Sequence, residues 1–423
     1  MNKNDVLFLL VALFIMYYLT QQASGYQVQK PSGYQVIGGL GPDANWSRGV
    51  YSPELGIWVS TGAPFGPNTQ AVSAYSYDGK KWIMNTSESG GLPVQYGPQY
   101  QNGWKSVAYG NTANGPLFVA VSDGYDNWIA QSNAHNYYVD GQLTNPSNYV
   151  SVATSTDGIN WITGTGLFPY SVWNIIYDKT SNYFQCVGDV EDGHQNIYNS
   201  YGAQSQDGIN WQMTNLPFAI TECNDLCYGS HGVVTAGVWD GPPPQTVTAL
   251  LPSTTTIWNT TSNMPSNENI TSVEFLQGAY YAVGQYGLYE STDGLNWTNL
   301  NPTDSFGNTL LNWSGSSWGW PSGSNLNGDI QYFKGHFVLH ISNIVWNTNQ
   351  ITMVSGQFYY SQNAQGPYEL GIYGNIPVDD YVIQLSTADN PHGGNDILIG
   401  LGYSATGQTC PLYSDDGIMW NKV

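Results

Sequence analysis

The stretch "STDGINW" (residues 155–161) decides the fold because the chain repeats it with small changes. Close copies stand at 205–211 ("SQDGINW") and 291–297 ("STDGLNW"), and looser copies at 76–82 ("SYDGKKW") and 414–420 ("SDDGIMW"). Asp followed by Gly favours a tight turn, because Gly accepts positive φ and the Asp side chain can bond nearby backbone amides. The recurrence therefore predicts one turn in each unit of a repeating structure.

The residues around each copy predict a unit of four strands. Residues 278–297 ("GAYYAVGQYGLYESTDGLNW") hold two apolar runs separated by a glycine-marked turn, then the Asp-Gly turn and a Trp. Residues 270–278 ("ITSVEFLQG") supply one more strand upstream. A four-stranded meander of roughly 40 or more residues is typical of a propeller blade. The large flat Trp ring suits the seam between neighbouring blades.

The spacing of the copies predicts seven units. The intervals between residues 211 and 297 and between 297 and 420 each leave room for one further unit. Degraded turns stand in them, at residues 253–258, ending in Trp258, and ahead of Tyr368. Residues 37–423 are therefore expected to form an all-β, seven-bladed propeller of four-stranded antiparallel blades, preceded by an N-terminal hydrophobic helix.

The repeated phrase resembles the Asp-box of sialidase-like propellers, Ser/Thr-x-Asp-x-Gly-x-x-Trp, with one residue fewer between Asp and Gly. The resemblance covers about residues 35–423. It implies that the phrase is a structural turn between the two outer strands, on the face away from an active site. The turn residues would be Asp78, Trp82, Asp157, Trp161, Asp207, Trp211, Asp293, Trp297, Asp416 and Trp420. Sialidases use three arginines on the substrate carboxylate, and the single Arg48 argues against that activity.

The charge balance limits the possible partners. The chain has 9 Lys and Arg against 30 Asp and Glu, a formal net charge of −21. Nucleic-acid binding requires clustered basic residues that neutralise phosphates, so no nucleic-acid partner is expected. No Cys/His spacing resembles a zinc site, and one carboxylate in each turn supplies too few oxygens for calcium. We therefore predict no metal and no cofactor.

The N-terminus and the sequons predict display outside the cell. Residues 6–19 are an unbroken apolar run, with residues 6–20 as the predicted membrane contact. Residues 1–23 are interpreted as a retained anchor or a cleaved signal, and residues 24–36 as an extended stalk. Six sequons are candidate glycosylation sites: Asn45, Asn85, Asn259, Asn269, Asn296 and Asn312. Four cysteines allow three pairings, and "CNDLC" at 223–227 is one candidate loop.

Two long insertions carry the candidate binding residues. Loops between the second and third strands of a blade share one propeller face with the links between blades. Residues 122–150 and 298–328 fall on this insertion face, where long loops are often functional. Their aromatics suit contact with sugar rings or with a protein, although packing within the loops is an equal alternative. They are Tyr125, Trp128, Tyr137, Tyr138, Trp313, Trp318 and Trp320.

Several acidic residues near the starts of the expected innermost strands are weak catalytic candidates. Those strands begin at the insertion face and line the central channel, so their carboxylates could converge there. A glycosidase needs two such groups, whereas a polar channel mouth needs no catalysis. The candidates are Glu222, Asp225, Glu274, Asp329, Asp379 and Asp380.

Three functions follow as hypotheses. The first is a surface-exposed adhesin, receptor-binding protein or virion or cell-envelope component that recognises glycans or a surface protein through the insertion face. The scarcity of Lys and Arg is similar to that of envelope proteins of thermoacidophilic archaea and their viruses. The second is a polysaccharide-active glycosidase or lyase that uses the channel carboxylates. The third is a structural subunit of a homo-oligomeric lattice, virion or filament.

Overall fold

The computed structural model describes most of the predicted propeller. The described residues are 44–64, 71–96, 103–122, 137–139, 142–144, 151–164, 171–190, 199–216, 222–239, 245–260, 263–265, 268–311, 324–347, 350–373, 384–388, 396–401 and 411–422. Residues 36–423 form one compact unit, and residues 1–35 are a separate unit outside the described part. The predicted anchor and stalk therefore cannot be compared with the structure. Among the described residues, no helix is long and apolar enough to cross a membrane.

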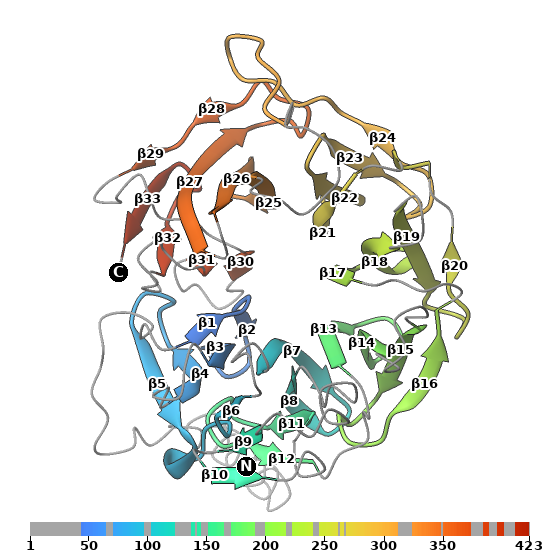
Figure 1. The fold of residues 1–423 in the computed structure, drawn as a ribbon, viewed down its shortest axis with the longest axis vertical. Helices are drawn as coiled ribbons and strands as arrows, with labels where there is room; N and C mark the ends of the chain where they lie inside the picture. The colour runs from blue at the N-terminus through green and yellow to red at the C-terminus, as the bar shows by residue number, and fades with distance from the viewer. Residues whose placement is uncertain are drawn as a thin grey trace, which may run out of the picture. The chain divides into compact units, whose positions relative to one another are not determined.

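Seven antiparallel sheets stand around a central axis, so the predicted seven-bladed propeller is confirmed (Figure 1). Blade 1 contains β1 (Ala44–Trp46), β2 (Val50–Ser52), β3 (Ile57–Pro64), β4 (Ala71–Ser76) and β5 (Trp82–Thr86). Blade 2 contains β7 (Trp104–Thr112), β8 (Gly115–Ser122), β11 (Val152–Ser155) and β12 (Ile162–Thr163). Blade 3 contains β13 (Ser171–Asp178), β14 (Tyr183–Val190), β15 (Asn199–Ser205) and β16 (Gln212–Asn215). Each blade runs from the channel outward in chain order.

The second half of the ring repeats this order. Blade 4 contains β17 (Glu222–Gly229), β18 (Gly232–Trp239), β19 (Gln245–Pro252) and β20 (Asn259–Thr260). Blade 5 contains β21 (Ile270–Leu276), β22 (Ala279–Gly284), β23 (Leu288–Ser291) and β24 (Thr298–Asn299). Blade 6 contains β25 (Ser324–Phe333), β26 (His336–Asn347), β27 (Gln350–Ser361) and β28 (Glu369–Leu370). Blade 7 contains β30 (Gln384–Ala388), β31 (Ile397–Leu401), β32 (Leu412–Ser414) and β33 (Met419–Lys422).

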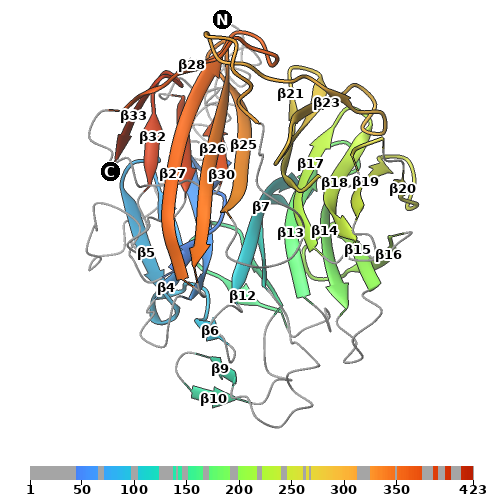
Figure 2. The ribbon, with the colours of Figure 1, turned by 45° about the horizontal axis from the view of Figure 1, so that its top comes forward.

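A few elements lie outside the regular pattern. The short β29 (Ile372–Tyr373) adds to the outer edge of blade 7 in parallel with β33. A small sheet of β6 (Gln95–Tyr96), β9 (Tyr137–Val139) and β10 (Gln142–Thr144) projects beyond the end of the blades (Figure 2). A short 3-10 helix, η1 (Ser87–Ser89), follows β5. The small sheet places part of the first predicted insertion outside the ring of blades.

The repeated turns join the third and fourth strands of their blades and are closed by their own side chains. In the copy at 155–161, the Ser155 hydroxyl accepts the Gly158 N–H at 2.9 Å. The Asp157 carboxylate accepts the N–H groups of Ile159 and Asn160 at 2.8 and 2.7 Å. The other four copies make the same Ser and Asp contacts. A turn that meets its own hydrogen-bonding needs in this way serves as scaffold.

The turn glycines explain how each turn also docks its blade. Gly158 has φ of +74°, and a Cβ there would stand 2.5 Å from a methyl of Val59 on β3 of the preceding blade. The glycines of the other copies approach the preceding blade in the same way, and Gly79 of blade 1 approaches Ile397 and Ile399 of blade 7. Only a residue without a side chain fits both constraints. The phrase therefore sets the spacing between blades around the closed ring.

The large aromatic residues predicted for the blade seams lie in the core. Trp82, Trp297 and Trp420 are buried, and Trp161 and Trp211 are partly buried. In blades 4 and 6, which carry degraded turns, Trp258 and Tyr368 are also buried. Trp58 and Trp82 pack with Ile399 and Leu401 where blade 7 meets blade 1. This apolar contact closes the ring.

Candidate functional site

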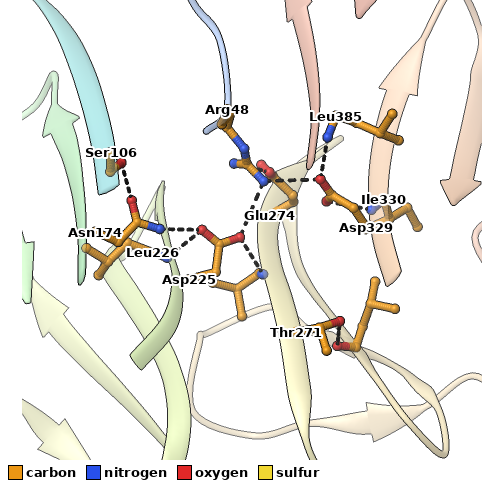
Figure 3. A network of polar contacts seen from close by, with 12 residues as sticks. Arg48, Ser106, Asn174, Asp225, Leu226, Thr271, Glu274, Asp329, Ile330 and Leu385 are labelled. Carbon is orange, nitrogen blue, oxygen red and sulfur yellow. Dashed lines mark hydrogen bonds and ion pairs between the residues drawn. The ribbon is translucent and has the colours of Figure 1, made fainter. Parts of the chain in front are cut away.

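Three of the predicted carboxylates meet one arginine in the central channel (Figure 3). Asp225 comes from β17, Glu274 from β21 and Asp329 from β25, the inner strands of blades 4, 5 and 6. Arg48 Nη2 lies 3.4 Å from Asp225 Oδ2 and 3.3 Å from Asp329 Oδ2, and Arg48 Nη1 contacts Glu274 Oε1. We call these four residues the channel cluster. It brings together groups separated by up to 281 positions in the chain.

Arg48 reaches the cluster because the inner strand of blade 1 is interrupted. β1 and β2 both pair with β3, at residues 62–64 and 57–59, and residues 47–49 leave the ladder between them. Ser47 anchors this break, because its N–H and its hydroxyl both donate to the Thr61 carbonyl, at 2.7 and 2.9 Å. Gly49 follows, where a Cβ would stand 3.0 Å from a methyl of Ile399 in blade 7. The break leaves Arg48 free to extend toward the far side of the channel.

Asp225 is held by hydrogen bonds that connect four blades. Its Oδ1 accepts hydrogen bonds from the Asn174 side-chain amide at 2.8 Å and from the backbone N–H of the next residue, Leu226, at 2.9 Å. Its Oδ2 accepts the Val273 N–H of blade 5 at 3.1 Å. Asn174 in turn accepts the Ser106 hydroxyl of blade 2 at 2.7 Å. Ser106, Asn174 and Asp225 each follow a β-bulge, which re-aims side chains along a strand.

Asp329 makes the corresponding connection between blades 6 and 7. Its Oδ1 accepts the Ile330 N–H at 2.8 Å, and its Oδ2 accepts the Leu385 N–H at 2.6 Å. The Asp329 side chain is fully buried, that of Asp225 is 3% exposed, and that of Glu274 is 12% exposed. Both oxygens of each aspartate therefore have partners within the protein. Glu274 is the carboxylate of the cluster that is most open to the channel.

Burial and crowding shift the acidity of the cluster. Burial raises the pKa of Asp329 to about 6; Arg48 opposes this shift and Asp225 adds to it. Burial also raises the pKa values of Glu274 and Asp225, again against the attraction of Arg48. Burial acts to lower the pKa of Arg48, but the three carboxylates outweigh it and raise that pKa. One positive charge thus offsets three buried acids only in part, and the cluster favours proton uptake in mildly acidic solution.

A cavity of about 600 Å³ lies against the cluster. Its inner wall includes Arg48, Glu274 and Gln331, and its outer part is formed by Glu54, Asn111 and Lys179. The outer residues lie at the turns between the first and second strands of blades 1, 2 and 3. The sequence placed the acidic residues toward the insertion face. Three of them lie together in the channel, but the cavity they border extends toward the opposite face.

The other predicted site residues lie mostly outside the described part of the structure. Glu222 begins β17, but its side chain is not described, and the same holds for Tyr137 and Tyr138 on β9. Asp379, Asp380, Tyr125, Trp128, Trp313, Trp318 and Trp320 lie outside the described residues. Of the candidate glycosylation sites, Asn312 also lies outside them. The aromatic binding surface therefore stays a prediction.

The structure bears on two other predictions, the glycosylation site at Asn85 and the disulfide loop at residues 223–227. Asn85 is 1% exposed and its side-chain amide donates to the Ile159 carbonyl, so a glycosyltransferase cannot reach it in the folded protein. Cys223 and Cys227 lie four residues apart on the extended β17, which separates them by ~13 Å and rules out a disulfide between them. Cys186 and Cys227 are buried. The "CNDLC" stretch is thus strand rather than a closed loop.

Two buried groups were not among the site residues predicted from the sequence. As the single arginine of the chain, Arg48 counted against sialidase chemistry, and in the structure it forms the centre of the channel cluster. A lone arginine between the first two strands, in a chain with 30 acids, was the available signal. His340 lies opposite Asp329 in the β25–β26 ladder, fully buried beside Phe358, and burial lowers its pKa to about 3. Nothing in the sequence marks His340 as different from the other histidines.

Comparisons with known proteins find only distant structural likenesses. No protein-family model matches the chain, and no curated protein matches it in sequence. A putative 6-phosphogluconolactonase from Bacteroides uniformis is similar in structure with 8% identity and a TM-score of 0.44, over 84% of this chain and 92% of that chain. A GH43 endo-arabinanase from Bacillus licheniformis has 13% identity and a TM-score of 0.31, over 73% and 92%. An endo-arabinase from Bacteroides thetaiotaomicron has 10% identity and a TM-score of 0.33, over 57% and 91%.

These likenesses carry no functional argument. Their identities and TM-scores are too low to transfer an activity, because one fold hosts many unrelated functions. Function must therefore be argued from the site itself. The class defined by the fold is a seven-bladed β-propeller with a charged cluster across its channel.

Proposed function

We propose that the chain is a surface-exposed binding protein that recognises glycans or another surface protein through the long aromatic-rich loops of the insertion face. The propeller would supply a rigid support, and the loops would supply recognition. Binding residues commonly lie on loops positioned by a rigid scaffold. Display outside the cell, by an N-terminal anchor or on an envelope or virion, is part of the same proposal and rests on the apolar run at residues 6–19.

The single observation that favours binding over catalysis is the internal use of the channel carboxylates. A glycosidase needs one carboxyl group that protonates the leaving oxygen and a second that acts as base or nucleophile, both facing the substrate. In Asp225 and Asp329, every carboxylate oxygen accepts hydrogen bonds from the protein, and both side chains are buried. Glu274 is left as a lone acid whose nearest polar neighbour is Arg48. These contacts suit a cluster that holds blades together.

The test compares retention and release in one assay. The full chain would be incubated with a panel of cell-surface polysaccharides and envelope extracts, and both bound ligand and released sugar would be measured. We expect retention without release. We also expect Trp128→Ala and Trp318→Ala to abolish retention, because aromatic anchors dominate such surfaces. Tyr77→Ala is the matched control, since Tyr77 is an exposed aromatic in a repeated turn.

The alternatives predict different outcomes. Release of sugar that disappears in Glu274→Gln would replace the binding proposal with a polysaccharide-active enzyme. Neither retention nor release would favour a structural subunit of an envelope lattice, virion or filament. Retention that survives both tryptophan substitutions would show that recognition lies elsewhere on the molecule.

A further inference from the structure

The cavity beside the channel cluster has features of a ligand site that the insertion-face proposal does not use. At about 600 Å³ it lies within the range of small-molecule sites, ~300–1,000 Å³. It is bordered by blades 1, 2 and 3 on one side and by residues of blades 4 to 7 on the other. Its outer part lies at the turns between first and second strands, on the face opposite the insertions. A ligand here would thus be independent of the long loops.

Two buried polar side chains in the cavity wall have no hydrogen-bond partner among the described residues. Gln331, on β25 two residues beyond Asp329, is 6% exposed and lines the cavity; no described residue forms a hydrogen bond with its amide, whose polar atoms are not fully enclosed. Ser386, on β30, is also 6% exposed, and its hydroxyl is unpaired. Buried polar groups are nearly always hydrogen-bonded, and leaving one unpaired is costly. Both groups border the same cavity, so a polar molecule within it would satisfy them.

The charges around the cavity select the kind of molecule. Arg48 is the charged group of the cluster most exposed to the cavity, 21% against 12% for Glu274 and 3% or less for the aspartates. Because it is the most exposed of these charges, its guanidinium repels a cationic ligand at short range. The three carboxylates around it outweigh its single charge, so an anionic ligand gains no net attraction. A neutral ligand with several hydroxyl groups is left as the best fit.

The outer part of the cavity adds apolar faces to this polar inner wall. Tyr51, Tyr109 and Tyr177 line it, and the hydroxyls of the last two are bonded to protein groups: that of Tyr109 donates to Glu54, and that of Tyr177 to Asn111. With these hydroxyls occupied, the rings contribute chiefly their flat surfaces. Flat aromatic faces next to amides and hydroxyls suit the alternating apolar and polar faces of a sugar ring.

We propose that the channel cavity is a second binding site, for a neutral saccharide of one or two rings, with Gln331 and Ser386 as hydrogen-bonding residues. The site stands apart from the insertion-face proposal, because no residue of the two long loops is required. In this arrangement the channel cluster forms the inner wall of the cavity, and Arg48 presents donors to the ligand's hydroxyl oxygens.

Titration calorimetry and saturation-transfer NMR on the full chain would test the site with four free sugars. Glucose and maltose are the neutral probes, glucosamine the cationic probe and glucuronate the anionic probe. We expect the neutral probes to bind and the two charged probes to bind at least about ten-fold more weakly. Gln331→Leu and Ser386→Ala should each weaken maltose about ten-fold, as expected for one lost neutral hydrogen bond.

The controls separate this site from overall folding and from the surface loops. Gln212→Leu makes the same substitution on the exposed outer strand β16 and should leave maltose affinity unchanged. Trp128→Ala and Trp318→Ala should also leave it unchanged, even where they abolish retention on polysaccharides. No neutral sugar bound at 50 mM (on the order of the weakest affinity such a site would have), equal binding of glucuronate, or unchanged affinity in both cavity variants would overturn the proposal.

Discussion

Replacing Arg48 by Met should destabilise the propeller by about 3–5 kcal/mol at pH 7, the usual cost of removing one partner from a buried ion pair. Met keeps much of the side-chain stem, so the chief loss is the charge. Asp225 and Asp329, 3% and 0% exposed, would be left with no counter-charge, and both would repel Glu274. Urea unfolding, followed by tryptophan fluorescence, measures the change in the free energy of unfolding.

The pH dependence of this change identifies its cause. Burial raises the pKa of Asp329 from 3.8 to about 6 in the folded protein. A carboxyl group with a raised pKa stabilises the fold most below the ordinary value, and that contribution is lost as the pH rises through about 6. For Asp329 alone the difference corresponds to about 3 kcal/mol. Arg48 lowers the pKa values of all three acids. The free energy of unfolding of the variant should therefore be far below that of the native protein at pH 7 and close to it at pH 4.

A matched control tests whether the effect belongs to the channel. Lys80 forms an ion pair with Asp415 at 3.0 Å on the surface between blades 1 and 7, and Lys80→Met should cost less than about 1 kcal/mol. Adding Glu274→Gln to the Arg48 variant should restore part of the lost stability at pH 7, because one buried charge is removed. Equal stability of native protein and Arg48→Met at pH 7, or a loss of the same size at pH 4, would refute this account.

Three further substitutions and one control substitution test the scaffold by urea unfolding. Asp157→Ala removes the acceptor of two backbone N–H groups and should lower the free energy of unfolding by about 1–2 kcal/mol. If the turn holds no calcium, a chelator should leave the urea midpoint of the native protein unchanged. Gly158→Ala should lower the free energy of unfolding by about 2–4 kcal/mol, because Gly158 has φ of +74° and its new Cβ would stand 2.5 Å from Val59. Gly56→Ala is the control: Gly56 has φ of +62° but open space around it, so the loss should be about 1 kcal/mol. Equal losses in the two variants would show that the contact with Val59 does not matter. Asn85→Ala should cost about 1–3 kcal/mol by leaving the buried Ile159 carbonyl unpaired, and a neutral effect would contradict the burial of this amide.

The blades could be predicted from the sequence because the repeated turn requires particular residues. The Asp carboxylate accepts two backbone N–H groups, the Gly adopts a positive φ, and the large aromatic residue fills the seam between blades. The blades with degraded turns were still recognisable because Trp258 and Tyr368 retain the seam position and are buried. Such needs are met within a few residues of the chain or at a fixed neighbour. They therefore leave a pattern that can be seen in one sequence.

The channel cluster was only partly predictable, because its contacts join residues that are far apart in the chain. The position of Asp225, Glu274 and Asp329 near the starts of inner strands placed them in the channel, but no local pattern shows which oxygens are used internally. That depends on backbone N–H groups such as those of Val273 and Leu385, contributed by the next blade. Backbone partners carry no sequence signal. The direction in which the cavity extends was likewise decided by how blades 1 to 3 pack at the axis.

Arg48 has a structural consequence that the repeat alone does not provide. Blades in a propeller contact their neighbours, so a ring of seven blades has no intrinsic link across its centre. Arg48 belongs to blade 1 and binds acids of blades 4, 5 and 6, while Asp329 continues the connection to Leu385 in blade 7. Asp225 extends it through Asn174 and Ser106 to blades 3 and 2. One polar network therefore touches every blade, and its single cation is placed where its removal weakens the closed ring as a whole.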